Sequence, residues 1–161
     1  MRIIGIDPGM AIVGYCIMDY DKQNYENANT LVSCGSIQTD KNLTNSQRLL
    51  EIYKDLTELL NKFKPDVASV EQLFYFKNAK TLVPVAQARG VILMTIESLG
   101  IPLYEYTPLV VKQTITGYGR AQKEEVKDMV KILLKSDSQI SKLDDTTDAI
   151  AIALCHTMCG V

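Results

Sequence analysis

The chain has 161 residues, of which 47% are hydrophobic and 22% charged, and its formal net charge is −2 at pH 7. These values are typical of a soluble globular protein, and the length is that of a single domain, here residues 1–161. No run approaches the roughly 18 apolar residues that a membrane span needs. The first residues, MRIIGIDPG, lack the layout of a signal peptide. We therefore expect a complete, cytoplasmic protein with no membrane partner.

The first forty residues predict three strands. The apolar runs 2–7, 12–19 and 30–39 are separated by the turn PGMA (8–11) and by the polar loop 21–27. Such short connections join strands that are neighbours in a sheet. We expect an antiparallel meander.

From residue 46 the hydrophobic period changes to that of a helix. Over residues 46–63 the apolar side chains recur at steps of three and four, which predicts an inward face of Leu49, Tyr53, Leu56, Leu60 and Phe63. Pro65 ends this helix. After it we expect a strand at 66–72, a helix at 78–98 that Pro84 must start or kink, and a strand at 103–106. A short helix at 108–116, capped by Thr107, is followed by a flexible loop at 117–120. The last two elements are a helix at 122–135 and a helix that begins in the stretch 143–154. The predicted order is βββαβαβααα, an α/β fold.

The stretch LDDTTDAIAIAL (143–154) places three aspartates in front of an apolar helix. Asp144 is a good N-cap candidate. Asp145 and Asp148 are three residues apart, so on a helix they would lie side by side. Two adjacent carboxylates at the edge of a core repel each other unless a proton or a cation lies between them.

Two further acids end predicted strands. Asp7 ends the first strand and Glu71 ends the fourth. Because sites assemble where neighbouring strands end in an α/β sheet, we expect both to meet the aspartate pair there. Four carboxylates suit hard divalent cations such as Mg²⁺, with Mn²⁺ as a substitute. A pair of such ions can clamp the attacking and leaving oxygens of a phosphoryl transfer.

These residues lie in stretches that together resemble the RuvC family of crossover junction endodeoxyribonucleases, the Holliday junction resolvases. The stretches follow the family order over nearly the whole chain: IIGIDPGMAIVGY (3–15), DVASVEQLFYFKNAKT (66–81), AQARGV (86–91), EYTPLVVKQTITGYGRAQKEEV (105–126) and DDTTDAIAIALCH (144–156). The resemblance implies a ribonuclease-H-like fold, with a five-stranded mixed sheet and helices on both faces. It implies an enzyme that resolves four-way DNA junctions by paired symmetric nicks, leaving a 5′-phosphate and a 3′-hydroxyl.

The resemblance also assigns roles to particular residues. It places the family's metal ligands, for two Mg²⁺ per subunit, at Asp7, Glu71, Asp145 and Asp148. It places basic residues beside the cleaved phosphate at Lys112 and Lys123, and an aromatic residue at the junction crossover at Phe74. The partners implied are four-way junction DNA, a second copy of the chain in a homodimer, and the RuvA–RuvB branch-migration complex.

The charge distribution is consistent with a nucleic-acid partner on one part of the chain. Residues 72–135 carry nine Lys or Arg and five acids, whereas the remainder carries eight basic and fourteen acidic residues. The further DNA contacts that we expect in this basic stretch are Lys77, Lys80, Arg89 and Arg120. The row Lys123, Lys127, Lys131 and Lys135 is either a solvated helix face or part of the DNA surface.

The segment 85–100 is apolar on more than one helix face, which is typical of a helix buried on both sides. Its apolar residues are Val85, Ala86, Ala88, Val91, Ile92, Leu93, Met94 and Ile96. The second cover is either a partner subunit or another helix of the same chain. A two-fold dimer would present two metal sites to a roughly two-fold junction.

Other functions remain as alternatives. A ribonuclease H acting on RNA–DNA hybrids shares the two-metal chemistry, and fold does not exclude it. A non-catalytic junction-binding module would be expected to lack a carboxylate, and none is missing. An actin-like ATPase needs a much longer chain. The four cysteines form no CxxC pair, so we expect reduced thiols, and His156, the only histidine, has little support as a catalytic base.

Overall fold

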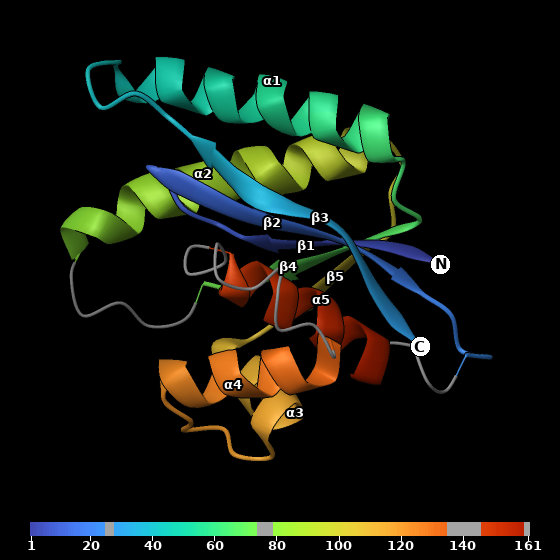
Figure 1. Ribbon diagram of the computed structural model, residues 1–161. Helices are drawn as coiled ribbons and strands as arrows, with labels where there is room; N and C mark the ends of the chain where they lie inside the picture. Colours follow the sequence, from blue (N-terminus) through green and yellow to red (C-terminus); the bar gives the residue numbers. More distant parts are fainter. Residues whose placement is uncertain (25–27, 74–78, 135–145, 160–161) are drawn as a thin grey trace.

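A five-stranded mixed sheet forms the centre of this computed structural model, which describes residues 1–24, 28–73, 79–134 and 146–159 (Figure 1). The strand order is β3-β2-β1-β4-β5. The strands are β1 (Arg2–Asp7), β2 (Ile12–Tyr20), β3 (Asn29–Gln38), β4 (Val67–Glu71) and β5 (Leu103–Tyr106). β1, β2 and β3 are antiparallel neighbours, whereas β1, β4 and β5 run parallel. The predicted meander and the mixed sheet are both confirmed.

Helices cover both faces of this sheet. The helices are α1 (Asn45–Phe63), α2 (Ala79–Ser98), α3 (Pro108–Thr116), α4 (Lys123–Leu134) and α5 (Thr147–Cys159). In Figure 1, α1 and α2 lie on one side of the sheet, and α3, α4 and α5 lie on the other. Each side has its own hydrophobic core, one containing Ile4, Ile52 and Ile92 and the other Ile3, Val126 and Ile150. The predicted order of elements is confirmed.

Helix ends follow local chemistry that the sequence already contained. At the start of α1, the side chains of Thr44 and Gln47 bond to each other's backbone N–H groups in a capping box. Lys64 ends this helix with a left-handed backbone, φ 47°. The Thr107 hydroxyl accepts a hydrogen bond from the Val110 N–H, which confirms the predicted cap of α3.

One local expectation needs correction, and one of two alternatives for Pro84 is removed. Tyr53 was predicted on the inner face of α1, yet it is 39% exposed, while Ile52 is fully buried. The buried stripe is Ile52, Leu56 and Leu60, and the predicted Leu49 and Phe63 pack against the same core, so Tyr53 alone was placed wrongly. Pro84 does not start α2 but lies inside it.

The connection between α3 and α4 is held by side-chain hydrogen bonds, although the sequence suggested a flexible loop. The amide of Gln113 donates to the Gly117 carbonyl at 2.7 Å and accepts from the Gly119 N–H at 2.9 Å. The Thr116 hydroxyl oxygen accepts a hydrogen bond of 3.1 Å from the Tyr118 N–H. The two helices that carry Lys112 and Lys123 are therefore joined by an ordered turn.

α5 is the most deeply buried helix, since residues 149–155 all have low exposure. It begins at Thr147, which places Asp148 in its first turn. Asp144 and Asp145 lie outside the described residues, so the cap and the side-by-side aspartate pair remain predictions. No helix in the described part of the chain is both long and apolar enough to span a membrane.

Candidate active site

The parallel pairing of β1 and β4 brings two of the predicted acids to one edge of the sheet. Ile6 and Val70 are direct neighbours in the ladder, and Asp7 and Glu71 each follow them at the end of their strand. Side chains alternate along a strand, so Asp7 shares a face with Ile3 and Gly5. That is the face on which α5 packs, because Ile3 belongs to the same core as Ile150.

Gly5 allows α5 to lie directly on β1. A Cβ atom added to Gly5 would lie 2.3 Å from the Ala149 carbonyl oxygen, far inside contact distance. On β4, the buried Ser69 hydroxyl donates to the Ile152 carbonyl at 2.9 Å. These contacts fix the first turns of α5 over the ends of β1 and β4, which is why Asp148 reaches the same place. Gly5 thus serves the packing of a helix on the sheet.

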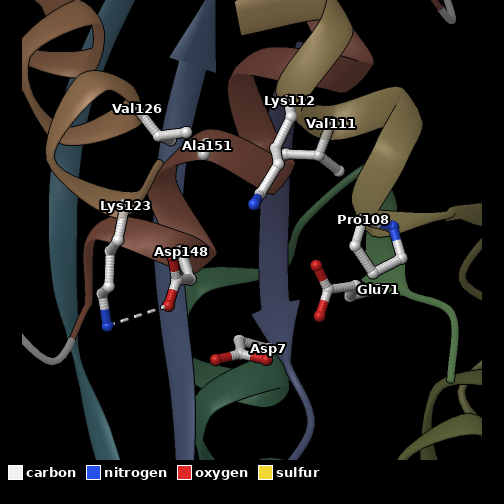
Figure 2. A pocket seen from close by; sticks show the side chains of 9 residues that line it. All are labelled: Asp7, Glu71, Pro108, Val111, Lys112, Lys123, Val126, Asp148 and Ala151. Atoms are coloured by element: carbon white, nitrogen blue, oxygen red, sulfur yellow. Dashed lines mark ion pairs between the residues drawn. The ribbon is translucent and has the colours of Figure 1, made fainter. Parts of the chain in front are cut away.

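The three acids meet in one pocket of about 260 Å³ (Figure 2). Its charged walls come from five different elements, and its apolar walls come from α3, α4 and α5. The lining residues are Asp7, Glu71, Pro108, Val111, Lys112, Lys123, Val126, Asp148 and Ala151. Five elements that are distant in sequence therefore supply acids and bases to one small space.

Burial and mutual repulsion raise the pKa values of the two strand-end acids. Burial raises the pKa of Asp7 to about 6, and Asp148 adds to the shift while Lys123 opposes it. Burial also raises the pKa of Glu71 to about 7, with Asp7 and Asp148 adding and Lys112 opposing. The two lysines therefore compensate only part of the crowded negative charge.

The donor set fits a hard divalent cation. All the acidic groups in the pocket are carboxylates, which Mg²⁺ and Mn²⁺ prefer, and burial together with mutual repulsion makes the charged forms of Asp7 and Glu71 unfavourable without a further cation. As they stand, no three acidic, His or Cys side chains of the described residues are grouped closely enough to hold an ion by themselves. The fourth predicted ligand, Asp145, lies outside those residues.

The predicted lysines lie on either side of the pocket, Lys112 on α3 and Lys123 at the first residue of α4 (Figure 2). The Lys123 ammonium nitrogen is 3.4 Å from Asp148 Oδ2. Lys112 opposes the raised pKa of Glu71. Each lysine is thus already near a carboxylate, and each could turn to a phosphate oxygen.

The other predicted DNA contacts are more scattered. Arg120 is exposed in the turn between α3 and α4. Phe74 and Lys77 lie outside the described residues, and of Lys80 only the backbone, in α2, is described. Arg89 is directed toward the protein itself, where it pairs with Glu105. Glu105 is not among the predicted site residues, although alternation within LYEY (103–106) separates it from its two tyrosine neighbours.

His156 belongs to the core rather than to the pocket. It is 2% exposed, and its Nδ1 lies 2.8 Å from the Tyr106 hydroxyl. The Tyr104 ring centroid is 4.5 Å away, and burial lowers the pKa of the histidine. All four cysteines are free thiols. Neither residue type supplies a nucleophile or base to the carboxylate pocket.

A mixed sheet in this order, with acids at the ends of β1 and β4 and on a closing helix, defines a ribonuclease-H-like, metal-dependent nuclease. Residues 3–156 match the family described as crossover junction endodeoxyribonuclease RuvC. The chain belongs to the RuvC family and is an endodeoxyribonuclease of that group.

Named relatives and solved structures agree with this assignment. The RuvC protein of Fusobacterium nucleatum is 49% identical over 156 residues, which cover 97% of this chain and 80% of the relative. That of Caldicellulosiruptor saccharolyticus is 46% identical over 158 residues, covering 98% and 93%. T. thermophilus RuvC in complex with a Holliday junction substrate matches with a TM-score of 0.86 at 30% identity, over 98% of this chain and 93% of that one. The yeast mitochondrial Holliday junction resolvase Ydc2 shares the fold, with a TM-score of 0.64 at 16% identity over 96% and 75% of the chains.

Proposed function

We propose that this protein resolves four-way DNA junctions by paired symmetric nicks, and that it does so with two Mg²⁺ ions per subunit. The observation that carries the proposal is the pocket, in which three carboxylates and two lysines converge. The family and the junction named in the T. thermophilus complex support the choice of substrate. Homologous recombination and repair are the processes that need such an activity.

In this proposal each side chain of the pocket has one role. Asp7, Glu71 and Asp148, together with Asp145, hold the cations, and Mn²⁺ can replace Mg²⁺. When bound, such ions supply a hydroxide nucleophile from water and neutralise charge at the scissile phosphate. Lys112 and Lys123 bind the phosphate oxygens and stabilise the additional negative charge as the bond breaks.

The apolar wall of the pocket strengthens these interactions. Pro108, Val111, Val126 and Ala151 line the same space as the acids. They limit the access of water, and electrostatic interactions are stronger where the local dielectric is lower. An in-line displacement there leaves a 5′-phosphate and a 3′-hydroxyl.

We further propose that the working form is a homodimer joined along α2, acting in the cytoplasm with the RuvA–RuvB complex. Ala88, Ile92 and Ile96 are buried in the core of their own subunit. Val83 and Met94 remain 60% and 56% exposed, and Gly90 between them has open space above it. The stripe Val83–Gly90–Met94, hereafter the α2 stripe, is the proposed contact between subunits.

The test offers the purified protein three substrates with Mg²⁺: a four-way junction, a linear duplex of the same sequence and an RNA–DNA hybrid. We expect symmetric nicks in the junction, and no product after Mg²⁺ is removed with EDTA. The variant Glu71→Gln serves as the control for contaminating nucleases. Preferential cleavage of the hybrid would instead support the ribonuclease H alternative, and tight binding without any cleavage would support the binding module.

A further inference from the structure

Arg89 contacts the strand that carries a predicted metal ligand, and it does so from behind the pocket. Its guanidinium forms an ion pair with Glu105 on β5. Its Nε also donates a hydrogen bond of 3.2 Å to the carbonyl oxygen of Glu71, the last residue of β4. The side chains of Arg89 and Glu105 are only 17% and 33% exposed, so both charges are largely withdrawn from water.

At the end of β4, different residues contact the two faces of the sheet. Tyr104 and Tyr106 contact His156 of α5, and Glu105 between them faces the opposite side, where α2 lies. The Glu71 carboxylate lines the pocket on the α5 side. Arg89 therefore holds the main chain of the residue whose side chain reaches into the pocket on the other face.

Arg89 acts on Glu71 by holding its main chain in place rather than by changing the charge around its carboxylate. The charged groups that change the pKa of the Glu71 carboxyl are Asp7, Asp148 and Lys112, all in the pocket. Arg89 bonds instead to the carbonyl oxygen of the same residue. Beyond that point, the Gln72 N–H still bonds to the Tyr106 carbonyl at 2.8 Å, so Arg89 and β5 hold both sides of the strand end.

An arginine suits this position because its planar fork can serve two acceptors at once. Glu105 supplies the counter-charge without which the half-buried guanidinium would be costly. The same arginine lies on α2, the helix that bears the α2 stripe. The contact therefore links the proposed subunit interface directly to the strand end of the active site.

We propose that Arg89, held in place by Glu105, is a positioning residue that sets the affinity of the carboxylate pocket for divalent cations. The proposal rests on the proposed function, since it takes Glu71 as a metal ligand. It gives Arg89 a different role from the DNA contact that the sequence suggested. Groups that orient metal ligands typically contribute about 10- to 100-fold to affinity.

The deciding experiment titrates the full-length protein with Mn²⁺ in the absence of DNA and measures free Mn²⁺ by electron paramagnetic resonance. We expect Arg89→Met to weaken Mn²⁺ binding by about tenfold or more. Arg89→Lys keeps the charge beside Glu105 but lacks the fork, so it should weaken binding less. Glu105→Gln leaves Arg89 without its counter-charge, and its Mn²⁺ affinity should lie between those of wild type and Arg89→Met.

Arg2 provides a matched control at the other end of the same sheet. It pairs with Asp19 through two bonds of 2.8 Å and donates to the Phe63 carbonyl at 3.1 Å, the same kind of double contact. Arg2→Met should lower the melting temperature without changing Mn²⁺ affinity. If Arg89→Met does not fold, Arg89→Lys decides, and wild-type Mn²⁺ affinity in a folded Arg89 variant overturns the proposal.

Two further measurements separate the alternatives. Junction binding is measured in EDTA as a function of salt: a positioning residue leaves the salt slope unchanged, whereas loss of a phosphate contact reduces it by about one and overturns the proposal. Glu71→Gln is titrated with Mn²⁺ in parallel. If it binds Mn²⁺ like wild type, the ligand assignment fails together with this inference; if it binds weakly while Arg89→Met does not, only the inference fails.

Discussion

Asp7 and Glu71 are carboxylates held at the edge of a core, where ionisation is unfavourable without a nearby positive charge. Burial raises the pKa values of both residues, the neighbouring acids add to the rise, and the two lysines of the pocket oppose it only in part. Such a pocket is costly to keep in a folded protein unless a ligand compensates it. The charges of these few residues therefore determine both the chemistry of the pocket and the stability of the metal-free protein.

Neutral replacements of the acids should separate catalysis from DNA binding. Asp7→Asn, Glu71→Gln and Asp148→Asn should each lower Mg²⁺-dependent junction cleavage by about 10³-fold, since metal ions supply several kcal/mol of transition-state stabilisation. Junction affinity in EDTA should not fall, because the basic residues bind the DNA. Lys112→Ala is the matched control: it should lose cleavage while keeping wild-type Mn²⁺ affinity. Cleavage by any acid variant at the wild-type rate would remove that residue from the ligand set.

The metal-free protein should become less stable as the pH rises. Asp7 has a pKa of about 6 in the fold against an ordinary value of 3.8, and Glu71 about 7 against 4.5. Between roughly pH 4 and pH 7 the folded state thus binds more protons than the unfolded chain, so the free energy of unfolding falls with pH and stays low above pH 7. Asp7→Asn should remove a penalty on the order of 2 kcal/mol at pH 8 and change little at pH 4.

Thermal melts in EDTA at both pH values check this directly. Added Mn²⁺ should stabilise wild type at pH 8 more than it stabilises Asp7→Asn. A wild-type protein that is equally stable at pH 4 and pH 8 without metal, or an Asn variant with no gain at pH 8, would show that the carboxylate cluster carries no such penalty.

Among the elements, α5 decides whether the pocket exists. It reaches Asp7 and Glu71 only because Gly5 leaves room for its backbone and Ser69 bonds to it. The periodic pattern of the sequence predicted this helix and its burial. It did not predict the close crossing over β1, because that depends on two segments almost 150 residues apart.

Replacing Gly5 with alanine should push α5 away from β1. The new methyl group would lie 2.3 Å from the Ala149 carbonyl oxygen, which is backbone and cannot turn aside. We expect a loss of about 1 to 3 kcal/mol in the free energy of unfolding, together with weaker Mn²⁺ binding. Within one subunit nothing lies within 4 Å of a Cβ added at Gly90, so Gly90→Ala should not lower the stability of the folded subunit, whatever it does to association. Denaturant unfolding that gave equal stabilities for Gly5→Ala and wild type would contradict the packing argument.

For the whole molecule, symmetry connects one pocket to a complete reaction. A single pocket can nick one strand, whereas resolution of a junction needs two nicks, which two identical pockets related by a two-fold axis would make. The α2 stripe is the exposed apolar surface proposed to form the contact between subunits at this two-fold axis. Val91, which the sequence also suggested as a contact, is partly buried against its own core and is a poor place to test association.

Met94→Lys should therefore give a folded monomer that no longer makes paired nicks. A charge placed in the centre of an apolar interface is desolvated without a partner, and the cost is several kcal/mol. Met158→Lys, on α5, is the control, because that methionine is similarly exposed at 52%. Sedimentation of both variants and of wild type at micromolar concentration measures the effect. A wild-type protein that stays monomeric both free and on junction DNA would end the dimer hypothesis.

The sequence by itself determined the order of elements, most of their bounds and the three acids that line the pocket. Those features depend on local periodicity, caps and strand ends, which neighbouring residues specify: the Thr107–Pro108 start of α3 is one example. The tertiary structure alone decided that Ile52 rather than Tyr53 is buried on α1, that Gly5 admits α5, and that Arg89 contacts Glu105 and Glu71. Each of these depends on the distance between segments far apart in the chain, and no local pattern carries that information.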